Sequence, residues 1–265
     1  MVSFPHAKIN LGLQVIKKRH DGLHNIVSCI YPIGWCDILE ITVGAELSFT
    51  GSGLEIPGDP NDNLCLQAYH LLKESFDLPP VHMHLHKAIP IGAGLGGGSS
   101  DAAFTLKGLR KLFDLPLADF ELERYASDLG SDCAFFIGDQ AAIATGIGDQ
   151  LERIELDLSD LHLLVVTPPV HVNTGEAYGM LTPKKVEHDL KSQLKRPPAE
   201  WTKLVVNDFE GPIFAKDPLI SGIKEKMLAK GAIYSSLSGS GSSVYGIFEE
   251  SLDVTQWFPE DHLIW

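Results

Sequence analysis

The chain has 265 residues, of which 44% are hydrophobic and 21% are charged, and its formal net charge is −14. Chains of this length more often form two modest domains than one. The turn at 146–149 is a plausible edge between them, so we expect domains over residues 1–150 and 151–265. The negative charge argues against a nucleic-acid-binding or membrane-binding surface, and no apolar run is long enough to span a membrane. We therefore expect a cytoplasmic protein; for its oligomeric state, monomer and homodimer both stay open.

Alternation of apolar and polar residues predicts the first strand. Its apolar positions would form one buried face, while Lys8 and Asn10 lie on the other; the apolar residues are Ala7, Ile9, Leu11, Leu13 and Val15. Lys8 and Asn10 would then project from the same side, about 6.7 Å apart. A pair of this kind is most often part of a solvated face.

Further elements follow from the spacing of apolar residues. Strands are expected over 38–43, 81–85, 161–167 and 244–248, and helices are expected to begin near residues 61–63, 99, 119 and 217. The stretch 192–200 contains two prolines and is expected to be a loop, whereas 146–149 is expected to be a turn and a domain edge.

The histidines of one strand could bind a metal and the cysteines could form disulfides, but both groups have a simpler interpretation. His82, His84 and His86 share one face of a strand, where half-buried sheet positions are more frequent than metal ligands. The four cysteines show no Cys-x-x-Cys spacing and are typical of small buried side chains in a reducing cytosol; they are Cys29, Cys36, Cys65 and Cys133.

The most informative segment is Pro90–Ala102, which places five glycines within residues 92–98 directly before a helical pattern. Glycines let backbone N–H groups approach a ligand without interference from a Cβ atom. The unpaired N–H groups and the positive dipole end of a helix N-terminus favour an anion. The segment therefore predicts a cradle for phosphate groups.

The type of cradle can be narrowed. An ordinary P-loop has Lys after its last glycine, whereas Ser99 follows Gly98 here. A Gly-x-Gly-x-x-Gly pattern exists in this loop, and Asp114 lies about twenty residues downstream, as in a dinucleotide-binding fold. That Asp114 ends a helix rather than a second strand, and Pro90 fits poorly before a tight turn, so the dinucleotide site is the weaker alternative.

Three motifs follow one another in the chain: Ala7–Leu11, the loop Pro90–Ala102, and a glycine–serine loop at Leu237–Ser243. In this order they resemble the motifs of the GHMP kinase superfamily. Other matching segments spread the resemblance over most of the chain; they are Arg19–His24, Asp62–Leu64, Leu129–Asp132, Gly146–Asp149 and Asn207–Glu210. The resemblance implies an α+β fold of two domains with the active site in the cleft between them.

The resemblance also implies an activity. The match is closest to members that use ATP to phosphorylate the 2-hydroxyl of a cytidine-diphosphate-linked methylerythritol, in non-mevalonate isoprenoid biosynthesis. The catalytic pair maps onto Lys8 and Asp132. Asp132 can accept or orient the hydroxyl proton, while Lys8 can lower the pKa of that hydroxyl and keep Asp132 ionised.

The remaining site residues are likewise implied by the resemblance. The ATP-binding positions are Asn63, Lys87, Pro90, Gly92, Gly94, Leu95, Gly96, Gly97, Gly98, Ser99 and Ser100. Those expected to bind the phosphoryl acceptor are Asn10, Leu23, His24, Thr174, Tyr178, Gly239 and Gly241. Mg²⁺ would bridge the β- and γ-phosphates near Ser99 or Ser100, without dedicated metal-binding side chains.

The sequence departs from the family pattern at Leu23, where an aromatic residue usually stacks on the cytosine. Leucine lacks this stacking, which leaves Tyr178 as one aromatic wall and puts the affinity for the base in doubt. Ala134 and Asp149 replace a common proline and a common glutamate.

Two other functions stay open: a kinase for another small alcohol, mevalonate-like or homoserine-like, and a nucleotide-binding sensor that has lost catalysis. The Asp21–His24 turn and Tyr178 count against the first. The presence of both Lys8 and Asp132 counts against the second, because a protein that only binds nucleotide needs no base.

Overall fold

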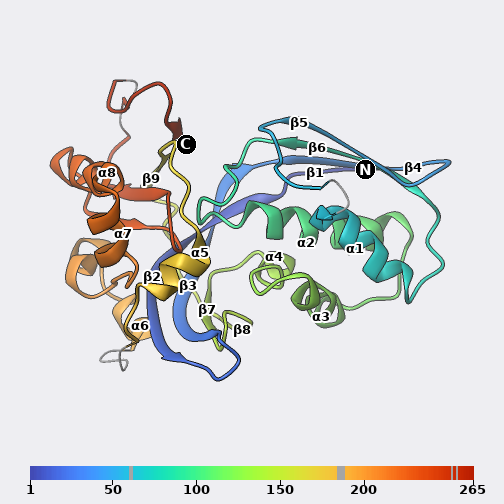
Figure 1. Ribbon diagram of the computed structural model, residues 1–265, viewed down its shortest axis with the longest axis horizontal. Helices are drawn as coiled ribbons and strands as arrows, with labels where there is room; N and C mark the ends of the chain where they lie inside the picture. Colours follow the sequence, from blue (N-terminus) through green and yellow to red (C-terminus); the bar gives the residue numbers. More distant parts are fainter. Residues whose placement is uncertain (60–61, 184–188, 252, 255) are drawn as a thin grey trace. The chain divides into compact units, whose positions relative to one another are not determined.

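The computed structural model describes residues 1–59, 62–183, 189–251, 253–254 and 256–265 (Figure 1). Contacts within the chain define two compact units that alternate along the sequence. Unit 1 comprises Met1–Lys8, Pro32–Ile91 and Gly96–Gln140; unit 2 comprises Ile9–Tyr31, Gly92–Leu95 and Ala141–Trp265. The domain boundary expected at residue 150 stays a prediction.

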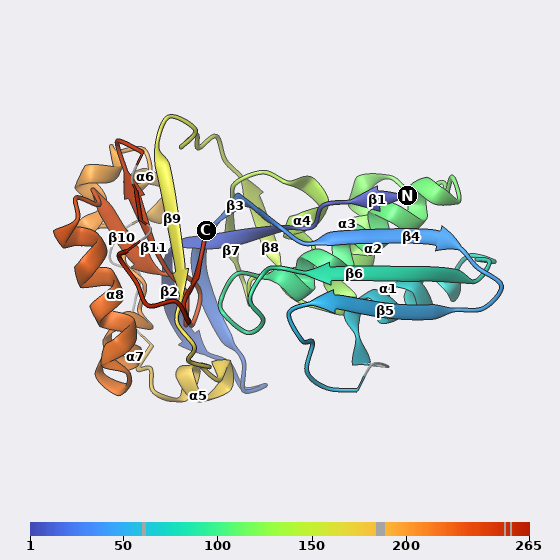
Figure 2. The ribbon, with the colours of Figure 1, turned by 90° about the horizontal axis from the view of Figure 1, so that it is seen from above.

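Unit 1 is built on a four-stranded sheet in the order β1-β4-β6-β5. Its strands are β1 (Val2–Ser3), β4 (Ile38–Val43), β6 (Val81–Lys87) and β5 (Ser48–Gly53), and only the β5–β6 pair is parallel. Figure 2 shows the helices on one face of this sheet; they are α1 (Leu64–Lys73), α2 (Gly97–Leu112), α3 (Asp119–Leu129) and α4 (Phe135–Gly138). Apart from Asn61, which lies outside the described residues, the predicted strands and helices of this region are confirmed.

The histidines of β6 lie on the sheet face opposite its buried positions. Their Nδ1 atoms are hydrogen-bonded to hydroxyls of the neighbouring β5, with His82 at 2.8 Å from Ser48 and His84 at 2.8 Å from Thr50. Among the described residues, no group of three His, Cys, Asp or Glu side chains could hold a metal ion. The hydroxyl partners place His82 and His84 at polar positions of the sheet.

A second sheet has the order β2-β3-β7-β8, with β2 (His6–Lys18), β3 (His24–Cys36), β7 (Ala142–Thr145) and β8 (Gln150–Arg153). The expectation of a solvated face on β2 is wrong, because Lys8 and Asn10 are each only 4% exposed. Alternation in sequence shows one apolar face but cannot show that polar residues on the other face are also covered. The predicted turn at 146–149 joins β7 to β8 as a hairpin within unit 2, not as a unit boundary.

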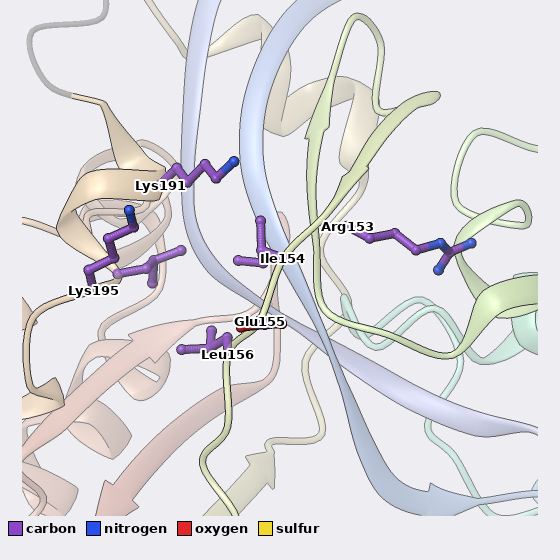
Figure 3. Close-up of a pocket in the computed structure, with 7 residues that line it drawn as sticks. Arg153, Ile154, Glu155, Leu156, Lys191 and Lys195 are labelled. Atoms are coloured by element: carbon purple, nitrogen blue, oxygen red, sulfur yellow. The ribbon is translucent and has the colours of Figure 1, made fainter.

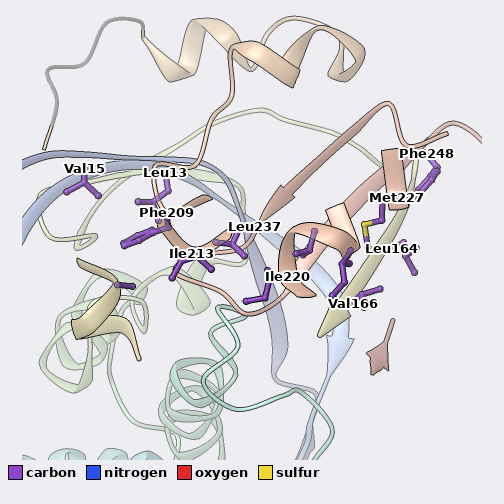
Figure 4. Packing of buried hydrophobic residues seen from close by; sticks show 13 residues of the cluster. Leu13, Val15, Leu164, Val166, Phe209, Ile213, Ile220, Met227, Leu237 and Phe248 are labelled. Carbon is purple, nitrogen blue, oxygen red and sulfur yellow. The ribbon is translucent and has the colours of Figure 1, made fainter. Parts of the chain in front are cut away.

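Unit 2 contains a third, antiparallel sheet in the order β10-β11-β9-β12. These strands are β10 (Tyr234–Leu237), β11 (Val244–Phe248), β9 (His162–Thr167) and β12 (Leu263–Ile264). Helices α7 (Glu210–Lys216) and α8 (Pro218–Ala229) bury Ile213, Ile220 and Met227 in one cluster with Val166 and Leu237 (Figure 4). Asp217 caps α8 by accepting a hydrogen bond from the Leu219 amide, as a residue before Pro at the first helical position commonly does.

The loop expected over 192–200 is partly helical. Helix α6 (Leu190–Gln193) reaches into it, and a 3₁₀ helix, η2 (Pro198–Lys203), begins at its second proline. Proline at the first helical position costs no hydrogen bond, and Trp201 is fully buried with its ring edge against Tyr234. Burial of this side chain stabilises a helix that local composition does not predict.

The cysteines are unpaired: Cys29, Cys65 and Cys133 are buried as expected, whereas Cys36 is half-buried. Within the described part of the chain, no helix has the length and apolar character needed to cross a membrane.

Candidate active site

Lys8 and Asp132 form an ion pair in unit 1. The Lys8 Nζ atom lies 3.5 Å from an Asp132 carboxylate oxygen, and their side chains are 5% and 35% exposed. Lys8 comes from β2, while Asp132 lies in the turn after α3, where the Cys133 amide donates to the Gly130 carbonyl. The structure thus joins a buried cation to a carboxylate that solvent can reach, an arrangement suited to moving a proton from an alcohol.

The glycine loop leads into helix α2 next to this pair. Gly96 is the N-cap of α2 and has a φ of +71°, a left-handed conformation that favours glycine. A Cβ atom at Gly96 would lie 2.9 Å from the Phe136 ring and 3.1 Å from the Lys8 stem. The start of α2 therefore packs directly on Lys8.

The first turn of α2 has the properties of an anion site. It contains no acidic residue, and its N–H groups carry the positive end of the helix dipole. Ser99 hydrogen-bonds the Cys133 side chain, while the buried Ser100 Oγ has no hydrogen-bond partner among the described residues. An orphaned hydroxyl at an anion-favouring helix start fits a phosphate group and its Mg²⁺ ion.

Lys87 lies beneath this turn rather than on the surface. Its Nζ donates to Asp37 and to Asp101 at 2.6 Å each, and a Cβ atom at Gly97 would lie 2.9 Å from it. Burial lowers the pKa of Lys87, but the charges of Asp101 and Asp37 outweigh that effect and raise it overall. Lys87 is therefore a charged support for the loop, and direct contact with ATP stays a prediction.

Asp101 and Asp37 differ in their surroundings. Burial raises the pKa of Asp101 to about 8 despite the opposing charge of Lys87, and its Oδ1 has no partner among the described residues. Asp37 is fully buried, and its Oδ1 accepts from the backbone amides of Ala88 and Ile89 at 2.6 and 2.8 Å. Asp37 thus holds the segment that leads from β6 into the glycine loop.

The other predicted ATP residues are placed in different ways. Asn63 caps α1, its side chain accepting from the Cys65 amide at 2.9 Å. Pro90 and Leu95 are buried, and Gly98 is exposed. Gly92 and Gly94 belong to unit 2 and have positive φ; a Cβ atom at Gly94 would collide with the Ser238 carbonyl oxygen.

The predicted acceptor residues all lie in unit 2, and several of them meet there. Asn10 donates to Ser28 Oγ at 2.8 Å, and a Cβ atom at Gly239 would lie 3.4 Å from the Asn10 Oδ1. Thr174, the first residue of α5 (Thr174–Gly179), is 3.1 Å from the Ser240 hydroxyl. These contacts gather Asn10, Thr174 and the 237–243 loop into one polar cluster.

The aromatic part of the predicted acceptor site is built around Tyr178. The ring stacked on Tyr178 is that of His24, with centroids 4.8 Å apart and planes inclined by 19°, and the Phe209 ring meets Tyr178 edge-on. Leu23, the residue before His24, is 49% exposed. Burial, helped by the charge of Lys18, lowers the pKa of His24, which favours the neutral form of this imidazole.

A separate pocket of about 270 Å³ lies in unit 2 (Figure 3). Its lining combines apolar side chains with one acidic residue, Glu155, and three basic ones, Arg153, Lys191 and Lys195. Lys191 is already paired with Glu152. None of the residues predicted for ATP, acceptor or catalysis lines this pocket, so it is distinct from the candidate active site.

Comparisons with known proteins identify the family of this chain. The N-terminal domain model of the GHMP kinases matches residues 63–147, and the GHMP kinase C-terminal model matches residues 191–256. The chain belongs to the GHMP kinase family, which replaces the dinucleotide-binding interpretation of its glycine loop.

Individual members of the family are similar to this chain over most of its length. The chain is 48% identical over 260 residues to the 4-diphosphocytidyl-2-C-methyl-D-erythritol kinase of Bacteroides fragilis, covering 97% of this chain and 95% of that protein. It is 51% identical over 249 residues to the protein of the same name from Cytophaga hutchinsonii, covering 94% and 92%. A crystal structure of 4-(cytidine 5'-diphospho)-2C-methyl-D-erythritol kinase has a TM-score of 0.80 at 31% identity, covering 93% and 90% of the two chains.

Sequence reasoning missed several residues that shape the site. Asp37 is the only charge in the stretch 32–39, a signal that a buried partner exists. Asp101 falls within the predicted loop and Asn207 within a matched family segment, yet neither received a role. The groups that these three residues bind lie elsewhere in the sequence, so no local pattern shows which partner each of them has.

Proposed function

We propose that this chain transfers the γ-phosphoryl group of ATP to the 2-hydroxyl of 4-diphosphocytidyl-2-C-methyl-D-erythritol. The observation that carries the proposal is the Lys8–Asp132 pair packed against the start of α2, in a chain about half identical to kinases of that name. The two family matches lie on either side of residue 150, which supports a proposed domain boundary there.

In this mechanism the Asp132 carboxylate accepts or orients the proton of the attacking hydroxyl. Lys8 supplies a positive charge beside the forming alkoxide and holds Asp132 in place. The N-terminal amides of α2 bind phosphate oxygens and stabilise the negative charge of the transition state. Mg²⁺ bound near Ser99 or Ser100 would neutralise the β- and γ-phosphates.

The acceptor would be held by the polar cluster of unit 2 and by the His24–Tyr178 stack. A neutral His24 can exchange hydrogen bonds with a nucleobase, and Tyr178 offers it an aromatic face. Unpaired cysteines and a negative net charge support the further proposal of a cytoplasmic enzyme that binds neither nucleic acid nor membranes.

The test is ADP release by the purified protein with ATP and Mg²⁺, with and without the diphosphocytidyl alcohol, and with ³¹P NMR of the product. A new phosphomonoester that requires this alcohol is the expected result. Equal or greater turnover of mevalonate or homoserine would instead indicate a kinase for another alcohol. ATP binding with no turnover on any alcohol would indicate a sensor.

A further inference from the structure

Asn207 is a buried amide that the proposed mechanism does not use. It is 1% exposed and lies just before α7. Its Nδ2 atom donates to the carbonyls of Leu237 and Gly239, each at 2.8 Å, and its Oδ1 accepts from the Phe209 amide at 3.0 Å. Both N–H groups of this side-chain amide are therefore hydrogen-bonded to the 237–243 loop.

The loop that Asn207 holds has a second side. There the Ser238 hydroxyl donates to the Gly94 carbonyl at 2.8 Å, and the Ser243 amide donates to the Ala93 carbonyl at 3.1 Å. Gly239 has a φ of +56°, and a Cβ atom on it would approach Gly94 Cα and Asn10 Oδ1 at 3.3 and 3.4 Å. Asn207 thus holds one side of the 237–243 loop, while the opposite side of the loop meets Asn10, a predicted acceptor residue.

The neighbouring Asp208 holds strand β2 at the same place. Its amide donates to the Leu13 carbonyl at 2.8 Å, and its carboxylate accepts from the Val15 amide at 2.7 Å. Asn10 lies three residues before Leu13 on this strand, and its own carbonyl accepts from the Tyr245 hydroxyl. Residues 207–208 therefore set the spacing between Asn10 and Gly239.

We infer that Asn207 is a positioning residue for the phosphoryl acceptor. It holds the Gly239 carbonyl, so that the opposite side of Gly239 stays against Asn10, and it touches no substrate itself. The inference rests on the proposed function, because Asn10, Gly239 and Thr174 are the residues proposed to bind the acceptor. Gly94, a predicted ATP residue, also contacts this loop through Ser238, but Asn207 bonds directly to the Gly239 carbonyl, so its effect should be larger on the acceptor than on ATP.

The central variant is Asn207→Ala, which removes both hydrogen bonds to the loop. Loss of these two hydrogen bonds should raise the KM for the diphosphocytidyl alcohol about tenfold, as expected when buried carbonyls lose their donor. The KM for ATP should stay within about twofold. A merely structural role would lower the melting temperature without separating the two KM values.

The matched control is Glu210→Gln, in the same segment. Glu210 accepts from Ser236 Oγ and the Leu237 amide and pairs with Lys224, but it does not contact Gly239. This variant should lose stability and keep both KM values. If Glu210→Gln and Asn207→Ala give the same kinetics, Asn207 is only structural and the inference is overturned.

Gly239→Ala keeps the inference testable if Asn207→Ala does not fold. Its added Cβ atom pushes the same loop from the front, so it should show the same selective rise in the acceptor KM. An unchanged acceptor KM in this variant would also overturn the inference. A wild-type protein that fails to phosphorylate the alcohol would refute the proposed function itself, whereas active wild type with unaltered variants would refute the inference alone.

Discussion

The Lys8 ammonium lies 3.5 Å from the Asp132 carboxylate, and the Lys8 stem packs under Gly96, the N-cap of α2. One buried side chain thus contacts both the proposed base and the proposed phosphate loop. A change at any of these three positions should consequently alter catalysis, and each change should leave a different signature.

Asp132→Asn keeps the shape of the side chain but removes the proton acceptor. We expect turnover to fall by roughly 10²–10⁴-fold while ATP binding, measured by calorimetry, persists. The control is Asp128→Asn, an exposed carboxylate near the end of α3, which should keep full activity. Turnover near that of wild type in Asp132→Asn would refute the assignment.

Substitutions at two glycines of the loop, Gly96 and Gly98, distinguish a role in packing from a role in ligand binding. In Gly96→Ala the alanine must adopt a left-handed φ, and its Cβ atom meets Phe136 and Lys8. The variant should therefore have a free energy of unfolding lower by about 1–3 kcal/mol and a reduced turnover.

Gly98→Ala is the matched variant, since its Cβ would meet only Leu64, at an ordinary 3.7 Å. It should melt like wild type yet bind ATP more weakly, because the exposed methyl group occupies the space of the phosphates. Unchanged ATP affinity in Gly98→Ala would mean that the loop is structural.

Asp101 should make stability depend on pH. Its pKa is raised from the ordinary 3.8 to about 8, mainly by burial, so the unfolded chain ionises first. The stability that protonated Asp101 contributes is therefore present below pH 4 and is lost as the pH rises to about 8.

Urea unfolding of wild type and Asp101→Asn between pH 5 and pH 9 measures this contribution. The wild-type protein should lose more stability over this range than the variant, in which Lys87 and Asp37 are the remaining charges of the cluster. Parallel pH profiles for the two proteins would contradict the raised pKa.

Leu23→Tyr restores the aromatic residue typical of the family. If Leu23 lies against the cytosine, the variant should lower the KM for the diphosphocytidyl alcohol by up to about tenfold and leave the KM for ATP unchanged. Leu228→Tyr, at an exposed position of α8, is the control for a general effect of added aromatic surface. A change in the KM for ATP alone would place Leu23 outside the nucleobase site.

His24→Ala tests the other half of the same turn. Removing the imidazole uncovers one face of Tyr178 and deletes a potential hydrogen bond to the base, so the KM for the alcohol should rise. Enzyme kinetics with each substrate varied in turn measures the effect. An unchanged acceptor KM would mean that the His24–Tyr178 stack serves only the fold.

Local features of this protein were determined by its sequence. The strand at Ala7–Val15, the glycine loop before α2 and the start of α8 follow from periodicity, glycine content and capping, all of which act between residues close in the chain. The tertiary structure alone decided which distant residues meet. It covered both faces of β2, brought Lys8 to Asp132, enclosed Lys87 between Asp37 and Asp101, and set Asn207 behind Gly239. Such contacts depend on the path of the whole chain, because burial and ion pairing are settled only when separate elements pack together.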